Sequence, residues 1–319
     1  MIHKPTIEQI KGAFFGIAIG DALGVPVEFM SRSHLSQNPV VNFEQEYFNN
    51  ESKGIWSDDS SLTFCLAETI IEEFSIKLLS EKIKAWYLEN YWAPNGVAFE
   101  IGLATRNAID RLEKGVPPTE SGSNGEYSNG NGSLMRIAPL AFYLINDSIE
   151  DRFQTIKGVS SITHSHIRSV ISCFFFIEFL QNLMKTNDKF EAFENTQNTV
   201  RDYINSTSCN NDEKALFLRL FYDKIYHLDQ DEIYSTAYVI HTLEASIWSF
   251  MNTNTYDEAV LKAINLGHDT DTTGSVTGAI AGLFYGITQI NKGFINTIVR
   301  SKDIEDLSNR FFTKMNEIN

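Results

Sequence analysis

Two sets of glycines, each spaced four residues apart, constrain the fold of this chain more than any other feature. They are Gly12, Gly16, Gly20 and Gly24 near the start of the 319-residue sequence and Gly274, Gly278, Gly282 and Gly286 near its end. Residues four apart form a stripe on one face of a helix, where a second backbone can approach closely. Because one glycine inside a helix costs about 1 kcal/mol relative to alanine, such repetition indicates a packing requirement. We therefore expect two helices that pack together in the core, next to the functional site.

Apolar residues recur at helical spacing along most of the remaining sequence. The predicted helices cover residues 62–74, 78–93, 100–112, 137–145, 153–184 (as one helix or two), 236–251, 256–266 and an amphipathic tail from Asn291. Residues 31–53 are expected to form a long loop, and residues 186–235 are polar and helix-prone. No segment shows the alternation typical of strands, and no domain boundary is evident. The sequence therefore predicts one all-α domain over residues 1–319.

The segment Gly267–Gly274 contains two carboxylates, Asp269 and Asp271, with hydroxyls between and after them. It precedes an apolar run and is expected to be a turn at the start of a buried helix. Carboxylates this close together repel each other unless a cation lies between them. An EF-hand is excluded, since its twelfth position would be Ile280 rather than glutamate. A helix N-cap with a solvated turn remains the structural alternative.

A second cluster of oxygen-bearing side chains, Ser57, Asp58 and Asp59, precedes another apolar-periodic helix. By itself this cluster could be an N-cap followed by acidic first-turn residues. Two such clusters with no matching basic cluster in the sequence favour a shared metal site. Ligands that are all oxygen suit Mg²⁺, Mn²⁺ or Ca²⁺ rather than zinc.

The net charge of −15 and the lack of a Lys/Arg cluster argue against partners such as nucleic acid or an anionic membrane surface. Cys65, Cys173 and Cys209 are too few and too scattered for a disulfide framework, which favours a reducing, cytoplasmic location. No apolar run is expected to reach the length of a transmembrane helix. Residues 13–19 could be the core of a signal peptide, although Asp21 interrupts the run early.

Three further features are weak when taken singly. Residues 115–133 are rich in Gly, Ser and Asn, and form either a linker or a loop that ends in a glycine-rich turn suited to phosphate. His164 and His166 lie close together without a third metal-binding histidine or cysteine, so a structural role is the more common case. Glu28 follows Pro26 on a loop, where a glutamate is usually a surface residue.

Together these stretches resemble the ADP-ribosylglycohydrolase family, which includes the dinitrogenase-reductase-activating glycohydrolase. The likeness rests on residues 20–28, 56–60, 130–136, 163–164 and 267–273, which occur in the family's order across nearly the whole chain. The resemblance implies a compact orthogonal helical bundle with a centre of two divalent cations, Mg²⁺ or Mn²⁺.

The resemblance also implies roles for individual residues. Ser57, Asp58 and Asp59 match the family's first ligand element, and the second is matched by Asp269, Asp271 and Thr272. The residues that match positions holding ADP-ribose are Asn131, Gly132, Ser133, Met135 and His164. Glu28 matches a glutamate that, in some relatives, gates or assists the site. Glu100 stands where many relatives have an aspartate thought to orient the substrate's guanidinium, so the chain departs from the family pattern at a position linked to the leaving group.

The implied activity is hydrolysis of the bond between ADP-ribose and an acceptor on a modified protein, with arginine as the expected acceptor, by a monomeric enzyme. Such bonds break through an oxocarbenium-like state, and Asp59, or one of the other ligand carboxylates, would take the proton of the attacking water. The alternatives are release of ADP-ribose from serine or another oxygen-linked acceptor, a non-catalytic ADP-ribose-binding or immunity protein, and a dinuclear phosphoesterase.

Overall fold

The computed structural model describes residues 4–48 and 53–318; four residues of the predicted loop at 31–53 lie outside this range. Its main helices are α1 (Ile7–Gly24), α2 (Arg32–Gln37), α3 (Asp58–Glu73), α4 (Ile76–Glu89), α5 (Leu103–Glu113), α6 (Pro139–Tyr143), α7 (Ile149–Ser161), α8 (Ile167–Leu183), α9 (Lys189–Ser206), α10 (Asn211–Ala215), α11 (Leu218–Tyr222), α12 (Val239–Met251), α13 (Tyr256–Ile264), α14 (Thr270–Tyr285), α15 (Lys292–Thr297) and α16 (Ser301–Ile318). Among the described residues, β-structure is limited to two isolated bridges. The prediction of an all-α fold is confirmed.

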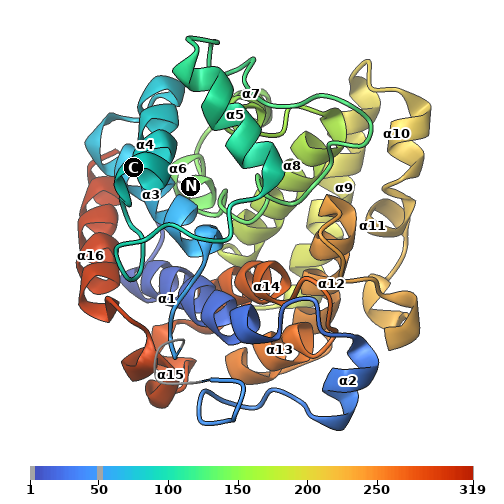
Figure 1. Cartoon of the computed structure of the whole chain (residues 1–319). Coiled ribbons are helices and arrows are strands. Elements are labelled where there is room, and N and C mark those ends of the chain that lie inside the picture. The colour runs from blue at the N-terminus through green and yellow to red at the C-terminus, as the bar shows by residue number, and fades with distance from the viewer. Residues whose placement is uncertain (1–3, 49–52, 319) are drawn as a thin grey trace.

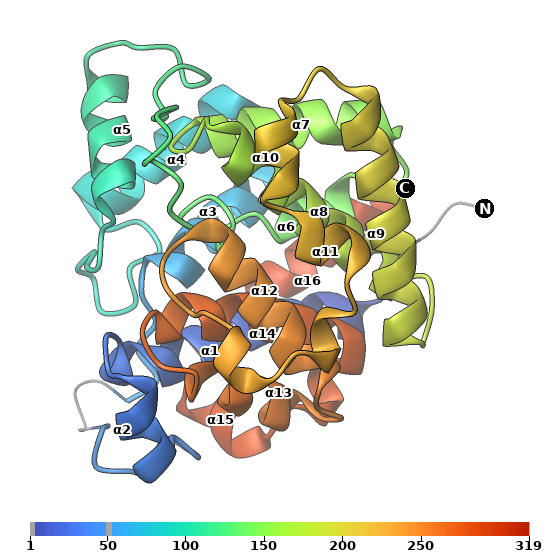
Figure 2. The ribbon, with the colours of Figure 1, turned by 90° about the vertical axis from the view of Figure 1, so that its right-hand side faces the viewer.

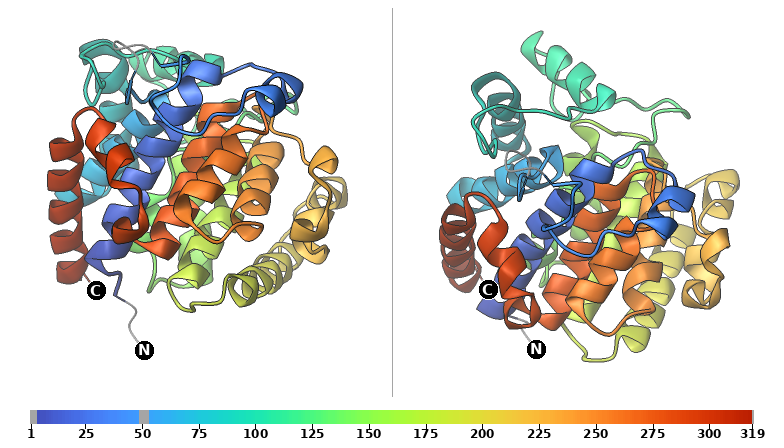
Figure 3. Two further views of the ribbon diagram at one scale, coloured as in Figure 1. Left: turned by 90° about the horizontal axis from the view of Figure 1, so that it is seen from below. Right: turned by 60° about the horizontal axis from the view of Figure 1, so that its bottom comes forward.

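Helices α1 and α14 lie side by side through the centre of the molecule (Figure 1, Figure 3). Their glycines meet in antiparallel register: a methyl group at Gly16 would lie 2.2 Å from the carbonyl oxygen of Gly278, and one at Gly20 would lie 2.1 Å from that of Gly274. The predicted packing of the two stripes is therefore confirmed. The two outer glycines are not paired with each other. A methyl group at Gly24 would lie 2.4 Å from the backbone of Asp271, whereas Gly286 ends α14 with a φ of 79° and a methyl group there would approach Glu8 of α1 no closer than 3.7 Å.

The other helices cover this pair on several sides. Helix α16 packs along α1, and α12 and α13 pack along α14. Figure 2 shows α9, α10 and α11 forming an outer layer beyond α8 and α12. The first turns of α3 and α14 both begin beside the end of α1 where Gly24 lies, so the fold places the two acidic clusters at one end of the central pair.

The expectation that no apolar run reaches the length of a membrane span is wrong for Ile7–Val27, where the mean hydropathy of an 18-residue window is 1.5. However, 83% of that window is buried inside the protein. The apolar residues of α1 are thus accounted for by its packing against α14 and α16, as expected for a core helix. The same contacts bury the segment 13–19 that resembled a signal-peptide core.

Several predicted boundaries are corrected. The helix expected from Glu100 begins at Leu103, because Glu100 has a φ of 59° and Gly102 is the N-cap. The predicted loop 31–53 contains helix α2. Residues 153–184 form two helices, with His164 in the break between them. The glycine-rich turn does not open directly into a helix, since α6 begins only at Pro139 and has 5 residues.

Residues 115–133 form a packed loop rather than a linker. The amide of Gly122 donates to the carbonyl of Ser161 at 2.9 Å, and that of Asn131 donates to the carbonyl of Ala237 at 3.1 Å. The loop thus bridges the end of α7 and the segment before α12. This bridging brings Asn131 and Gly132 to the two acidic clusters.

Candidate metal centre and active site

The two acidic clusters, more than two hundred residues apart in sequence, face one cavity of about 260 Å³. Eleven of the thirteen predicted site residues line it: Glu28, Asp58, Asp59, Glu100, Asn131, Gly132, Met135, His164, Asp269, Asp271 and Thr272. Ser57 and Ser133 do not. No lysine or arginine of the described residues lines the cavity. The cavity is therefore strongly acidic and lies where two helix N-termini meet.

The first cluster is held by a hydrogen-bond network that starts on α1. Ser57 is the N-cap of α3, and its hydroxyl accepts from the amide of Asp59 at 3.2 Å. The carboxylate of Asp21 accepts from the amide of Ser57 at 2.8 Å and from both the amide and the hydroxyl of Ser60, at 3.0 and 2.6 Å. Asp21 is fully buried, so this network fixes the start of α3 relative to the glycine-packed helix.

The second cluster is tied both to the first and to the glycine-rich loop. The hydroxyl of Thr272 donates to a carboxylate oxygen of Asp59 at 3.4 Å. The side-chain amide of Asn131 donates to the carboxylate of Asp269 at 2.6 Å and to the hydroxyl of Thr242 at 2.8 Å. Helix α3, helix α14 and the loop are thus cross-linked at the cavity floor.

The carboxylates have little compensating positive charge: no described lysine or arginine lines the cavity, although the buried Arg136 interacts electrostatically with Asp58. Burial is the main reason that the pKa values of Asp58, Asp59 and Asp271 are raised well above the usual range, and neighbouring carboxylates raise them further. Burial, followed by a hydrogen bond and the charge of Glu100, raises the pKa of Glu28 to about 9. Removing ionised carboxylates from water without a partner is costly. The arrangement favours either protons or cations in the cavity.

Two buried oxygen atoms show which alternative the geometry fits. Oδ1 of Asp59 and Oδ1 of Asp271 are buried and have no hydrogen-bond partner in the described part of the chain. One carboxylate oxygen from each of Glu28, Asp269 and Asp271 lies within 4.8 Å of the others. Carboxylate oxygens that converge, like those of the second set, and buried ones without a partner, like those of the first, are both suitable ligands for a hard divalent cation. The donor set therefore fits a metal of the Mg²⁺, Mn²⁺ or Ca²⁺ type.

A family model described as ADP-ribosylglycohydrolase matches residues 3–318 of the sequence. The chain belongs to the ADP-ribosylglycohydrolase family. It is 32% identical to a protein of Serratia proteamaculans named ADP-ribosylarginine hydrolase Tri1, over 97% of this chain and 80% of that protein. A protein of the same name from Pseudomonas putida is 28% identical, over 99% of this chain and 81% of the relative.

More distant members of the family show the same overall likeness. The ADP-ribosyl-[dinitrogen reductase] glycohydrolase of Rhodospirillum rubrum is 23% identical, over 91% of this chain and 90% of that protein. A solved structure titled ADP-ribosylglycohydrolase-related protein complex superposes with a TM-score of 0.79 at 24% identity, covering 97% of this chain and 98% of that one. This structural likeness confirms the ADP-ribosylglycohydrolase type of helical fold.

Within this family fold, the structure places the remaining predicted residues. His164 lies at the cavity wall, where burial followed by the charge of Arg136 lowers its pKa to about 3, so the ring is neutral. Its Nδ1 atom is 2.8 Å from the hydroxyl of Thr163. Ser133 is fully buried behind the wall, with its hydroxyl 3.0 Å from that of Ser160. The prediction that Ser133 contacts ADP-ribose is therefore not supported by its position.

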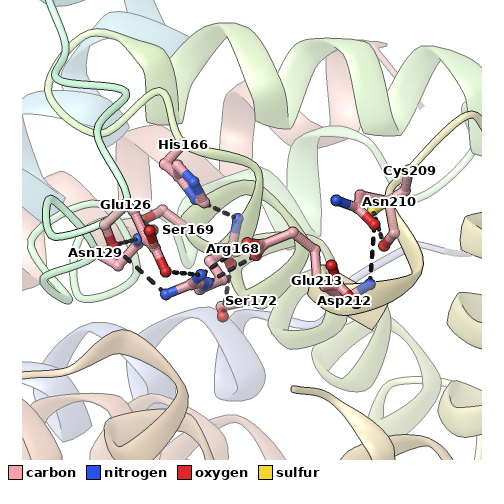
Figure 4. A network of polar contacts seen from close by, with 10 residues as sticks. All are labelled: Glu126, Asn129, His166, Arg168, Ser169, Ser172, Cys209, Asn210, Asp212 and Glu213. Carbon is pink, nitrogen blue, oxygen red and sulfur yellow. Dashed lines mark hydrogen bonds and ion pairs between the residues drawn. The ribbon is translucent and has the colours of Figure 1, made fainter. Parts of the chain in front are cut away.

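A second hollow of about 360 Å³ adjoins the cavity and shares Gly130 and Ala237 with it. Arg168 forms part of its wall and is held by two hydrogen bonds of 2.7 Å to the carboxylate of Glu213 (Figure 4). A carboxylate oxygen of Glu126 lies 3.8 Å from Arg168, and the side chain of Tyr127 is 98% exposed. The space available to a ligand therefore extends beyond the acidic cavity.

The sequence reasoning missed two residues that organise the site. Asp21 was considered only as an interruption of an apolar run, yet it holds the start of α3. A carboxylate inside a glycine-striped core helix was the available signal, since a buried charge needs partners. Thr242, which holds Asn131, carries no such signal because threonine is common in helices of every environment.

Proposed function

We propose that this chain hydrolyses the glycosidic bond between ADP-ribose and an arginine side chain of a modified protein, with two divalent cations, Mg²⁺ or Mn²⁺, at the acidic cavity. The observation that carries the proposal is the pair of buried carboxylate oxygens without partners on Asp59 and Asp271, two residues that line a cavity with no cationic side chain among the described residues. The two relatives named ADP-ribosylarginine hydrolase support arginine as the acceptor.

In this proposal Asp58 and Asp59 hold the cations from α3, and α14 contributes Asp269, Asp271 and Thr272. When bound, the cations would lower the pKa of the attacking water, hold the ribose hydroxyls and offset the negative charge of the substrate. Ser57 supports this set through its hydrogen bonds with Asp59.

The protein residues then carry out the chemistry. Asp59 accepts a proton from the water whose oxygen attacks the anomeric carbon of the ribose. The carbon–nitrogen bond breaks, and the leaving guanidine takes up a proton, for which Glu28 is positioned at the cavity mouth. The neutral ring of His164 and the backbone of Gly132 bind the ADP-ribose, and Asn131 keeps Asp269 in place. The rest of the nucleotide occupies the second hollow beside Arg168.

A substrate panel tests this proposal. The protein is incubated with arginine-modified and serine-modified proteins in Mg²⁺, in Mn²⁺ and in a chelator, and free ADP-ribose is measured. We expect release from the arginine-linked substrate only when a cation is present. Release from serine alone would favour an oxygen-linked acceptor, while tight binding of ADP-ribose without turnover would indicate a non-catalytic binding protein.

A further inference from the structure

Two exposed apolar side chains stand at the mouth of the acidic cavity. Phe29 is 79% exposed and Leu103 is 74% exposed, and both residues line the opening. They come from different segments, the loop after α1 and the first residue of α5. Isolated exposed apolar residues are normal on a protein surface. Two such residues that come from separate segments and meet at one opening indicate a shared role in binding.

The backbone at Phe29 is held in a rare conformation. Its φ is 64°, a value that bulky residues rarely adopt, and His268 has the same φ. The amide of Phe29 donates to the carbonyl of His268 at 2.6 Å, and the amide of His268 donates to the carbonyl of Met30 at 2.8 Å. The rim loop is thus fixed to the loop that carries Asp269. Strained conformations of this kind cluster where ligands bind.

The size of the cavity requires that part of the substrate lie outside it. Its volume of about 260 Å³ is below the roughly 300–1,000 Å³ of pockets that enclose a drug-sized ligand. An ADP-ribosyl group on a folded protein carries the neighbouring residues of that protein with it. With the linkage at the carboxylates and the nucleotide extending into the second hollow, the side of the opening lined by Phe29 and Leu103 is left for those neighbours.

We propose that Phe29 and Leu103 form a docking rim for the polypeptide segment that flanks the modified side chain. This inference rests on the proposed function, and it adds a preference for protein-borne over free ADP-ribosyl-arginine. Glu28 and Glu100 lie at the same opening, and the whole chain carries a net charge of −15. The segment that fits the rim therefore has an apolar residue next to the modified arginine and basic residues around it.

Two substitutions remove the apolar side chains of the rim and remain compatible with its backbone conformation. Phe29→Asn deletes the ring, and asparagine tolerates a positive φ better than most residues. Leu103→Ser shortens the other side chain at the start of α5. Leu88→Ser is the matched control, because Leu88 is 51% exposed at the end of α4 and does not line the cavity.

The test compares kcat/KM for an arginine-ADP-ribosylated protein with that for free ADP-ribosyl-arginine. In the double variant Phe29→Asn/Leu103→Ser, we expect the ratio of the two values to fall about tenfold, mainly through a higher KM for the protein substrate. Each single variant should lower the ratio about threefold. Leu88→Ser should leave both values unchanged.

Three results would overturn the inference. Equal losses on both substrates would assign the rim to the nucleotide or to catalysis, and an unchanged ratio would exclude it from substrate choice. A wild-type protein inactive on both substrates would remove the proposed function and the rim together. If Phe29→Asn fails to fold, as judged by circular dichroism, Leu103→Ser alone decides the question.

Discussion

Helix α14 takes part in two regions with opposite physical character. Along its body, Gly274, Gly278 and Gly282 bring its backbone into contact with that of α1, in a dry and close-packed interface. At its N-terminus, Asp269 and Asp271 lie in a cavity crowded with buried carboxylates. The first region is stable because its surfaces match, whereas the second carries electrostatic cost. The comparison indicates that the glycine interface supplies the rigidity that keeps the acidic groups together.

The largest expected effect is on the glycine interface. In Gly16→Ala the new methyl group would lie 2.2 Å from the carbonyl oxygen of Gly278, so the two helices must separate. We expect the free energy of unfolding to fall by at least about 3 kcal/mol. Urea denaturation measures the change. Gly102→Ala is the control, because a methyl group there meets nothing within 4 Å; equal losses in both variants would refute the role of the interface.

The acidic region should behave in the opposite way. In Asp271→Asn a buried carboxylate is replaced by a neutral group of similar shape, so a cation ligand is lost together with a repulsive charge. We expect turnover to fall by about 1,000-fold, while the free energy of unfolding in chelator rises by about 1 kcal/mol. Full activity would argue against the metal site, and a large loss of stability would contradict the view that this region carries electrostatic cost.

Glu28 lies at the edge of the acidic region and should show a milder effect. In Glu28→Gln the carboxylate that faces Asp269 and Asp271 becomes an amide of nearly the same size. We expect kcat to fall about tenfold, because a proton-transferring group is lost while the proposed cation ligands on α3 and α14 remain. A wild-type rate would reduce Glu28 to a loop residue. Rates for the two variants should be measured at the same saturating concentration of Mn²⁺.

The pH dependence of stability tests the comparison without mutation. In chelator, the raised pKa of Asp21, about 6, and of Glu28, about 9, mean that the folded state binds more protons than the unfolded chain. Stability should therefore be highest below about pH 4 to 4.5, where these groups are protonated in both states, and should decrease between about pH 4 and 9. Other titrating groups contribute to the absolute curve, so the readout is its change on adding Mg²⁺.

Divalent cation should flatten this profile, because it stabilises the ionised carboxylates of the folded state. Urea denaturation at pH 5, 7 and 9 with and without Mg²⁺ provides the measurement. Identical slopes under the two conditions would count against cation binding in the cavity.

The parts of the structure that follow regular spacing could be predicted from the sequence. The fourfold glycine spacing led to the α1–α14 pair, and the two acidic clusters led to the cavity because each precedes an apolar-periodic helix. The single-domain organisation remains a prediction. The direction of individual side chains could not be predicted from the sequence. Ser133 is an example: it lies in a turn that does not continue directly into a helix, and its hydroxyl points to Ser160 rather than into the cavity.

The backbone conformation of the rim could not be predicted for a related reason. A positive φ at Phe29, Glu100 or His268 runs against the preference of each residue and arises from tertiary contacts. For Phe29 and His268 these contacts are the hydrogen bonds between their loops. The residues around each loop form no pattern that predicts hydrogen bonds between the two loops. The shape of the opening was therefore outside what composition and periodicity could indicate.

Helices α1 and α14 pair Gly12 with Gly282, Gly16 with Gly278 and Gly20 with Gly274. This pairing limits which insertions and deletions the chain can accept during evolution. Inserting or deleting one residue in either helix would rotate every later position by about 100° and move side chains into all the remaining backbone contacts at once. Length variation among relatives should therefore be excluded from both helices and confined to the connections. Alignments across the family can be anchored on these three pairs before any catalytic residue is considered.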